Sequence, residues 1–344
     1  MARRKSLSSI VKRAVKQAVK PKGKSLKLNW GLIGAIALLF SVYLIVTLFN
    51  GKDYSGWQEG LEELWGNFTA IGDGLKEDSR PVMAVNGEVE VHFIDVGQGD
   101  SILITGNGQA ILIDAGENDK GDEVVAYLEK CGVKHLDLAI GTHPHSDHIG
   151  GLDVVIDNIS TDQLWMPEIP EKIMPTTRTF NDLLDAVENN NVSALTAVPG
   201  DRAELCGGLL EVLGPVKEYD DLNDISLVTK FTFGGNSFLF TGDMESGAEA
   251  DLLESGAKVA ADVLKMGHHG SSTSSSKAFV DAVNPDIFAI QLGEGNSYGH
   301  PHRETLALLK ERKAKVWRND LNGSIVMRSD GSSIVVSTER GGES

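Results

Sequence analysis

The chain has 344 residues, of which 41% are hydrophobic and 24% are charged, with only 10 prolines. These proportions are typical of a globular protein and exclude wholesale disorder and collagen-like repeats. Two cysteines, Cys131 and Cys206, exclude a disulfide scaffold and a cysteine-rich zinc site, although they leave room for one bridge. The length allows one large domain with attachments or two modest domains.

Charge is divided unevenly along the chain. Residues 1–27 contain ten of the 32 Lys and Arg residues and no acidic residue. Removing those ten leaves 22 basic residues against 49 acidic residues in the other 317 positions, a net charge of -27. A chain divided in this way is expected to contact two different environments.

One long apolar segment follows the basic region. The sequence GLIGAIALLFSVYLIVTLF, residues 31–49, carries no charge and as a helix would span about 28 Å, close to the thickness of the hydrocarbon core of a bilayer. We therefore predict one transmembrane signal anchor over residues 29–49. A buried core helix and a cleaved signal peptide are the alternatives, but the segment has no polar face and no A-x-A-like cleavage site follows it.

The flanking segments predict how the chain meets the membrane. Lys and Arg are retained on the cytoplasmic side, so residues 1–28 are expected to be a cytoplasmic arm, with the acidic C-terminal part outside the cell membrane. Helical spacing of apolar residues in this arm suits a helix lying on an anionic leaflet, and a disordered basic tail or a mitochondrial transit peptide is the alternative. Residues 50–86 are expected to be a connector with a short amphipathic helix, because Trp57, Leu61 and Trp65 recur at helical spacing.

From residue 87 to residue 340 short apolar runs alternate with helical patterns, which is typical of an α/β layered domain. Strands are expected at VEVHFIDV (89–96), SILIT (101–105), AILIDAG (110–116), 136–142, ADVLKMG (261–267) and DIFAIQLG (286–293), with hairpins over 229–243 and 323–337. Helices are expected over 119–131, 245–254 and 303–313.

A run of metal-binding side chains follows the strand over 136–142. His143, His145, Asp147 and His148 lie within six residues, more donors than one tetrahedral ion requires once further ligands arrive. Alternate residues of an extended segment share a side, so His143 and His145 are expected to act together. The chain must then turn for Asp147 and His148 to reach a second ion. This pattern predicts a two-metal hydrolytic site rather than solvated loop histidines.

The phrase THPHSDHIGG (142–151) resembles the signature of the metallo-β-lactamase-fold hydrolases. Further phrases narrow the resemblance to the extracellular hydrolase domain of the ComEC/Rec2 family of DNA-uptake proteins and its stand-alone relatives. They are FIDVGQGDSILI (93–104), ILIDAG (111–116), SLVTKF (226–231), FLFTGDM (238–244), KMGHHGSSTSSS (265–276) and YGHP (298–301). The resemblance covers residues 88–338 and implies a metallo-β-lactamase αββα sandwich. The polytopic competence domain of that family is not among these phrases, so the chain is not expected to form the pore itself. A separate channel protein is a conceivable partner for which the sequence gives no support.

The resemblance also implies a division of metal ligands. His143 and His145 would bind one zinc ion, Asp147 and His148 the second, and Asp243 would bridge them. His300 matches the last histidine of the second site. Mn²⁺ is the alternative to zinc at both sites. The implied ligand set is therefore His143, His145, Asp147, His148, Asp243, His269 and His300.

His269 enters that set because the family pattern has another histidine between the first cluster and the bridging acid, whereas this chain has none from Ile149 to Gly242. The resemblance places His269 at the first ion. His268 has three possible roles: it could be the ligand instead of His269, it could orient a ligand, or it could contact the substrate. Asp114 is expected to orient the histidine loop without binding metal. Ser271 is expected near the substrate, in a loop that also caps the following helix.

A glycine-rich turn and a basic patch are two further features of the sequence. Asp95-Val-Gly97-Gln-Gly99-Asp100 is interpreted as a tight turn between strands, since it contains no G-x-G-x-x-G dinucleotide motif. Basic residues near Lys313 would suit phosphate contacts or a solvated helix face.

The leading function is a membrane-anchored extracellular metal-dependent hydrolase, a phosphodiesterase or nuclease acting on DNA through two zinc ions, with Asp147 positioning or deprotonating the attacking water. A phosphodiesterase acting on cell-envelope polymers of the teichoic-acid type is the second enzymatic hypothesis. A tethered, metal-stabilised binding module without turnover is the third. The acidic balance of the domain argues against tight binding of a polyanion.

Overall fold

Alternating apolar side chains build two β-sheets in the computed structural model, which describes residues 87–341. The predicted arm (1–28), signal anchor (29–49) and connector (50–86) lie outside these residues. Among residues 87–341, no helix combines the length and the apolar character that crossing a bilayer requires.

The first sheet has eight strands, and its order is β17-β16-β1-β2-β3-β5-β7-β8. Neighbouring strands pair antiparallel from β17 to β3 and parallel from β3 to β8. Its strands are β17 (Ile334–Thr338), β16 (Ile325–Ser329), β1 (Val89–Phe93), β2 (Ile102–Gly106), β3 (Gln109–Ile113), β5 (Leu138–Ile140), β7 (Gln163–Met166) and β8 (Ser193–Thr196).

The second sheet has seven strands in the order β15-β14-β13-β12-β11-β10-β9. It is parallel from β15 to β12 and antiparallel from β12 to β9. Its strands are β15 (Lys315–Arg318), β14 (Ile287–Ile290), β13 (Val263–Lys265), β12 (Asn236–Phe240), β11 (Val228–Phe233), β10 (Gly208–Gly214) and β9 (Arg202–Leu205). A small parallel pair joins β4 (His135–Leu136) to β6 (Ser160–Thr161).

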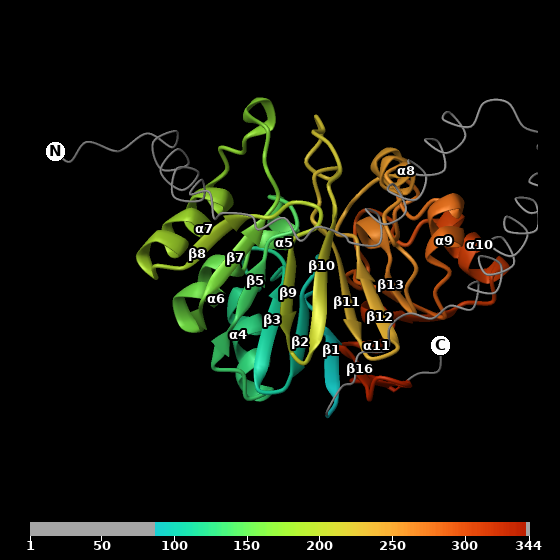
Figure 1. Ribbon diagram of the computed structural model, residues 1–344, viewed down its shortest axis with the longest axis horizontal. Helices are drawn as coiled ribbons and strands as arrows, with labels where there is room; N and C mark the ends of the chain where they lie inside the picture. The colour runs from blue at the N-terminus through green and yellow to red at the C-terminus, as the bar shows by residue number, and fades with distance from the viewer. Residues whose placement is uncertain (1–86, 342–344) are drawn as a thin grey trace, which may run out of the picture. The chain divides into compact units, whose positions relative to one another are not determined.

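Three apolar cores separate four layers. The central core lies between the sheets and includes Phe93, Phe231 and Phe240, each at most 1% exposed. The outer cores pack helices on the other face of each sheet, and Figure 1 shows these helices on opposite sides of the strands. The helices are α4 (Gly121–Lys130), α5 (Ser146–Ile149), α6 (Leu152–Asn158), α7 (Arg178–Asn189), α8 (Ser246–Glu254), α9 (Lys277–Val283), α10 (Arg303–Glu311) and α11 (Asn319–Asn322), with short turns η1 (Glu171–Ile173) and η2 (Gly267–Gly270). This αββα arrangement confirms the predicted sandwich.

The ends of the strands bring the predicted site together. The histidine run follows β5 of the first sheet, whereas Asp243 follows β12 and the His268–His269 pair follows β13 of the second sheet. In parallel sheets, loops at the carboxyl ends of strands share one edge, where ligands commonly bind. A backbone hydrogen bond from Leu227 N to Thr142 O (2.9 Å) joins the two sheets beside this edge.

Candidate metal centre

Asp243 lies at the middle of a cluster of buried histidines. Its Oδ1 is 3.2 Å from His148 Nε2, and its Oδ2 is 3.5 Å from His269 Nε2, 3.7 Å from His268 Nε2 and 4.0 Å from His143 Nε2. His143, His148, His269 and Asp243 are each at most 2% exposed. Histidines from one loop of the first sheet and one loop of the second therefore converge on a carboxylate carried by another loop of the second sheet.

Two groups of donors surround Asp243. His143 Nε2 faces His145 Nδ1 at 3.0 Å. On the other side, His269 Nε2 faces Asp147 Oδ2 at 3.2 Å, with the ring of His148 centred 5.2 Å from that of His269. The sequence placed His269 with His143 and His145, but these distances favour its association with Asp147 and His148.

The donors fit a divalent cation. His148 Nε2 and Asp243 Oδ1 are buried and lie 3.2 Å apart, and neither atom has a well-formed hydrogen bond within the described part of the chain. An unpartnered imidazole nitrogen beside a buried carboxylate is costly unless a cation binds both. Asp100, His148, Asp243 and His269 together offer donor atoms within 4.8 Å of one another, so the cluster can hold a divalent metal.

Asp114 supports the histidine loop from behind. Its Oδ1 accepts a hydrogen bond from Thr142 N (2.8 Å), and its Oδ2 accepts from Thr142 Oγ1 (2.7 Å) and from His148 Nδ1 (2.8 Å). Because His148 Nδ1 donates its proton to Asp114, the opposite nitrogen, Nε2, is turned toward Asp243. Burial raises the pKa of Asp114, which lies outside the donor cluster itself.

Asp100 also belongs to the site, although the sequence did not predict a role for it there. Its carboxylate is 1% exposed, with Oδ2 2.5 Å from Lys265 Nζ and Oδ1 3.2 Å from His269 Nδ1. His269 Nδ1 also donates to Gln291 O (2.9 Å). Asp100 thus contacts the nitrogen of His269 that faces away from Asp243, and we assign it to orienting His269 rather than to the ligand set.

The turn that carries Asp100 is packed against the histidine loop. Asp100 N donates to Asp147 O (3.0 Å), and a Cβ added to Gly99 (φ +132°) would lie 2.3 Å from that same oxygen. Gln291 Nε2 donates to Ile94 O and Ser101 O, at the two ends of the turn. The only sequence signal for this role was a charged residue ending a glycine-rich turn, which is too general to single out Asp100.

The histidine turn η2 has an uncommon backbone. His268 and His269 both adopt left-handed conformations, with φ of 49° and 53°. Non-glycine residues seldom take this conformation, and it concentrates at functional sites where the surroundings enforce it. Here it turns His269 into the cluster, while His268 remains partly exposed and contacts Glu245 through Nδ1 at 3.3 Å.

Electrostatic coupling divides the histidines into protonated and neutral groups. Burial by itself lowers the pKa of His269, but the carboxylates of Asp243 and Asp100 outweigh it and raise that pKa to about 10. Burial is similarly outweighed at His148 by Asp243 and Asp114, so its pKa lies well above the usual value. Burial and the nearby charge of His148 hold the pKa of His143 well below its usual value.

The pKa values of Asp147 and Asp243 are lowered by the neighbouring histidines. Burial would raise the pKa of Asp147, but the charge of His148 and a hydrogen bond with His269 lower it below the usual value. The charges of His148 and His269 likewise outweigh burial and lower the pKa of Asp243. Both carboxylates are therefore ionised at neutral pH and available to a cation.

His300 and Ser271 lie near the cluster without touching Asp243 in the described structure. The ring of His300 is centred 5.7 Å from that of His268 and 6.4 Å from that of His269. Burial and the charge of His269 lower the pKa of His300 to about 4, so it is neutral. Ser271 is buried and its Oγ accepts from Thr273 N, while Ser276 caps α9 by accepting from Phe279 N.

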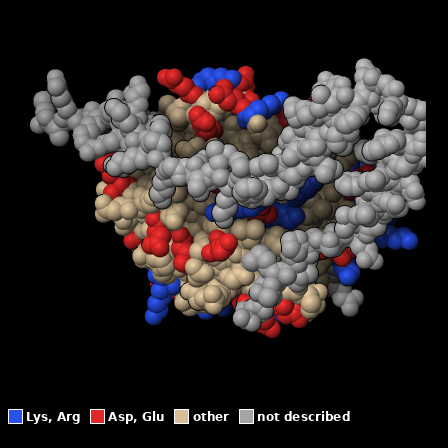
Figure 2. Space-filling view, in the orientation of Figure 1, with Lys and Arg blue, Asp and Glu red and all other residues tan. Residues whose placement is uncertain are grey.

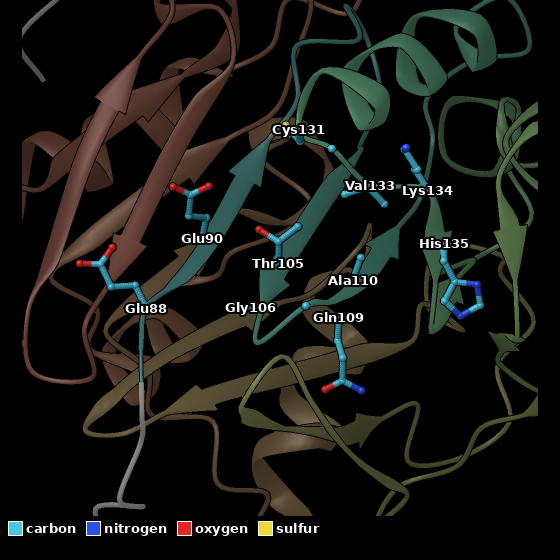
Figure 3. Close-up of a pocket in the computed structure, with 12 residues that line it drawn as sticks. Glu88, Glu90, Thr105, Gly106, Gln109, Ala110, Cys131, Val133, Lys134 and His135 are labelled. Atoms are coloured by element: carbon cyan, nitrogen blue, oxygen red, sulfur yellow. The ribbon is translucent and has the colours of Figure 1, made fainter.

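Figure 3 shows a separate surface pocket of about 560 Å³ that includes none of the predicted metal ligands. Its charged and titratable lining residues are Glu88, Glu90, Cys131, Lys134 and His135. Burial raises the pKa of the Cys131 thiol, which makes it a poor nucleophile and ligand. Within residues 87–341, the donor cluster therefore lies at the strand ends and apart from this pocket.

Comparison with known proteins gives the family. Residues 94–293 match the metallo-beta-lactamase superfamily. The chain is 31% identical over 263 residues to ComE operon protein 3 of Bacillus subtilis, with 71% of this chain and 33% of the relative covered. It is 31% identical over 244 residues to Recombination protein 2 of Haemophilus influenzae, with 69% and 28% covered. The matches thus span about a third of the length of these relatives.

Among solved structures, the metallo-beta-lactamase fold protein YhfI of Bacillus subtilis is similar with 11% identity and a TM-score of 0.46, over 73% of this chain and 100% of that one. The chain is also 30% identical over 250 residues to Competence protein ComA of Neisseria gonorrhoeae, with 72% of this chain and 33% of that protein covered. These three relatives confirm the predicted resemblance to the ComEC/Rec2 proteins. With its αββα sandwich and its cluster of histidines and acids at the strand ends, the chain belongs to the metallo-β-lactamase superfamily.

Proposed function

We propose that the protein is a metal-dependent phosphodiesterase that cleaves DNA outside the cell membrane, to which residues 29–49 anchor it. The observation that carries the proposal is the convergence of imidazole nitrogens on Asp243 from both sheets. The competence-protein relatives favour DNA as the substrate. Zn²⁺ is the proposed metal, because imidazole and carboxylate suit it, and Mn²⁺ is the alternative.

We further propose how the donors divide between two ions. His143 and His145 would hold one ion, and Asp147, His148 and His269 the other, with Asp243 shared between the two. Such ions, when bound, supply Lewis acidity to a phosphoryl group and lower the pKa of water toward about 7. His300 and His268, which lie next to this set, would face the substrate.

The protein's own side chains orient this chemistry. Asp114 fixes His148, and Asp100 together with Gln291 O fixes His269, so the Nε2 atoms of both rings point toward Asp243. Asp147 Oδ2 would bind metal and accept the proton of the attacking water, since its ionised state leaves a lone pair free. His268, partly exposed beside Asp243, is placed to contact a phosphoryl oxygen.

The division of ligands can be tested by counting metals in two variants of the full chain. His269→Ala is expected to lose the ion held with Asp147 and His148 and to retain the other, giving about half of the wild-type metal content in elemental analysis. His300→Ala is expected to retain both ions. Loss of metal from both variants would instead support the ligand roles inferred from the family resemblance, in which His300 also binds metal, and full metal content in His269→Ala would remove His269 from the ligand set.

Two alternatives remain testable in the same preparation. Cleavage of a teichoic-acid-type polymer but not DNA would redirect the proposal to the cell envelope. Metal binding without hydrolysis of any phosphodiester would favour a tethered binding module.

A further inference from the structure

Tyr298 projects an aromatic ring into solvent beside the metal centre. Its side chain is 62% exposed, and it is the one aromatic residue among the exposed large hydrophobic side chains of residues 87–341. A planar ligand that covers an exposed aromatic ring removes apolar surface from water, which favours binding.

The loop that carries Tyr298 is fixed by its own hydrogen bonds. Asn296 Nδ2 donates to Gly293 O (3.1 Å) and to His300 O (2.8 Å), while Asn296 Oδ1 accepts from His300 N (3.0 Å). These bonds close the loop on both sides of Tyr298.

A second support comes from His302. Its Nδ1 accepts from Ser272 N (2.9 Å), so its Nε2 carries the proton and donates to Tyr298 O (3.3 Å). The backbone of Tyr298 is therefore tied to the loop that follows His269, and the ring is presented at a defined position rather than on a free chain.

The ring is also connected to the donor cluster through contacts between histidine rings. The Tyr298 and His300 rings are stacked, with centroids 5.7 Å apart and planes inclined by 24°. The His300 ring lies 5.7 Å from that of His268, whose Nε2 is 3.7 Å from Asp243 Oδ2. A planar group stacked on the free part of Tyr298 would therefore lie at the mouth of the metal centre.

The acidic balance of the chain limits the contacts that it can make with the phosphates of DNA. The chain beyond residue 27 holds 49 Asp and Glu against 22 Lys and Arg, and Figure 2 shows separate groups of both kinds among uncharged residues on the visible surface. Phosphate contacts to a basic surface are the usual source of affinity for DNA, and an acidic surface supplies few of them. Stacking of a base on an aromatic side chain is uncharged and contributes affinity regardless of that surface.

We propose that Tyr298 is a stacking platform for an unpaired nucleobase adjacent to the phosphodiester at the metal centre, which makes single-stranded DNA the preferred substrate. This inference rests on the proposed function, since it names the form of DNA that the same site accepts. A base within a duplex is stacked on its neighbours and is not free to occupy Tyr298.

The test compares kcat/KM of the full chain in detergent for two single-stranded oligonucleotides of equal length, one with bases and one with a run of abasic sites at the cleaved position. Tyr298→Ala is expected to lower kcat/KM for the base-containing strand by about 5- to 150-fold, the effect of one lost base–aromatic contact. It should leave cleavage of the abasic strand unchanged. Tyr298→Phe should retain wild-type values on both.

Val335→Ala provides a matched control, because Val335 is 64% exposed on β17, in a strand that contributes no donor to the cluster. It should cleave both strands at the wild-type rate. The wild-type to Tyr298→Ala ratio should also remain the same between low and moderate salt, since stacking is not screened by ions.

Equal activity of wild type and Tyr298→Ala on the base-containing strand would overturn the stacking role while leaving the DNA phosphodiesterase intact. An equal loss on both strands would also overturn it, because the residue would then act on the metal centre itself. A wild-type chain that cleaves a small phosphodiester or an envelope polymer but no DNA would overturn the proposed DNA substrate and this inference together.

Discussion

Asp147 lies where the two loops of the centre meet. Its Oδ2 is 3.2 Å from His269 Nε2, and its main-chain oxygen accepts a hydrogen bond from Asp100 N. Most of its side chain is buried, with 22% exposed, so a carboxylate ionised at neutral pH is held beside the histidines and still reaches solvent. That combination suits a group that binds metal and handles a proton of water.

Asp147→Ala is therefore expected to lower kcat/KM for phosphodiester hydrolysis by at least about 10²-fold, the usual scale for removing a general acid or base. Binding of an oligonucleotide and the circular dichroism spectrum should be retained. Asp185→Ala, at an exposed position of α7, is the matched control and should remain fully active. Retained hydrolysis in Asp147→Ala would remove this residue from the reaction.

Metal binding should release protons at neutral pH. The carboxylates around His148 and His269 raise the pKa of both rings, that of His269 to about 10, so both are protonated at pH 7 before metal binds. A metal ion takes the Nε2 lone pair and must displace that proton, so the apparent affinity should rise with pH. Titration calorimetry of Zn²⁺ in buffers of different ionisation enthalpy measures the release. Binding without net proton release would contradict the proposed ligand roles of both rings.

At the scale of elements, β13 and the turn after β1 are held together by charge. Lys265 in β13 is fully buried, and its ammonium pairs with Asp100 in the turn. A buried ion pair adds little stability over an apolar pair, but removal of one partner leaves an uncompensated charge.

Lys265→Met is expected to lower the free energy of unfolding of the metal-free chain by about 3–5 kcal/mol, because the Asp100 carboxylate would be left buried without its partner. Urea unfolding monitored by tryptophan fluorescence gives the value. Lys277→Met removes an exposed pair with Asp281 on α9 and should change stability by less than about 1 kcal/mol. Equal effects of the two substitutions would show that the buried pair has no structural role.

The sequence predicted the elements whose apolar residues follow a clear pattern along the chain. The expected hairpin over 229–243 corresponds to β11 and β12, and the helix over 245–254 to α8. The strand over 136–142 is instead divided between β4 and β5 at Asp137, whose carboxylate accepts a hydrogen bond from Ala110 N. A pairing with another strand cannot be deduced from local hydrophobicity.

Other elements carried too weak a pattern to be predicted. Every residue of β8, at the edge of the first sheet, is exposed, so nothing in its sequence separates it from a loop. The histidine run was recognisable because its donors are close in sequence. Asp100 was not, because its partners Lys265 and His269 are distant along the chain and only the packed sheets bring them together.

At the scale of the whole molecule, the metal centre joins the two halves of the sandwich. His143 and His148 follow a strand of the first sheet, whereas Asp243 and His269 follow strands of the second. A ligand that binds only the folded state stabilises it, and this one would bridge both sheets. Three buried carboxylates, those of Asp100, Asp114 and Asp243, lie in the same region, together with the partly exposed carboxylate of Asp147.

Removal of metal with a chelator is expected to lower the free energy of unfolding of the full chain by about 2.7–4.1 kcal/mol relative to protein with free metal at 100 to 1,000 times its Kd. Readdition of Zn²⁺ should restore both stability and hydrolysis. Differential scanning calorimetry with and without chelator tests the effect, and an unchanged unfolding transition would mean that metal does not link the sheets.

The most direct test of the central claim is metal content and phosphodiester hydrolysis measured on one preparation of the full chain. Elemental analysis is expected to give about two zinc ions per chain, as in two-metal hydrolytic sites. The same protein should cleave bis-p-nitrophenyl phosphate and single-stranded DNA. One metal or none, with no cleavage of either substrate in added Zn²⁺ or Mn²⁺, would contradict the binuclear phosphodiesterase.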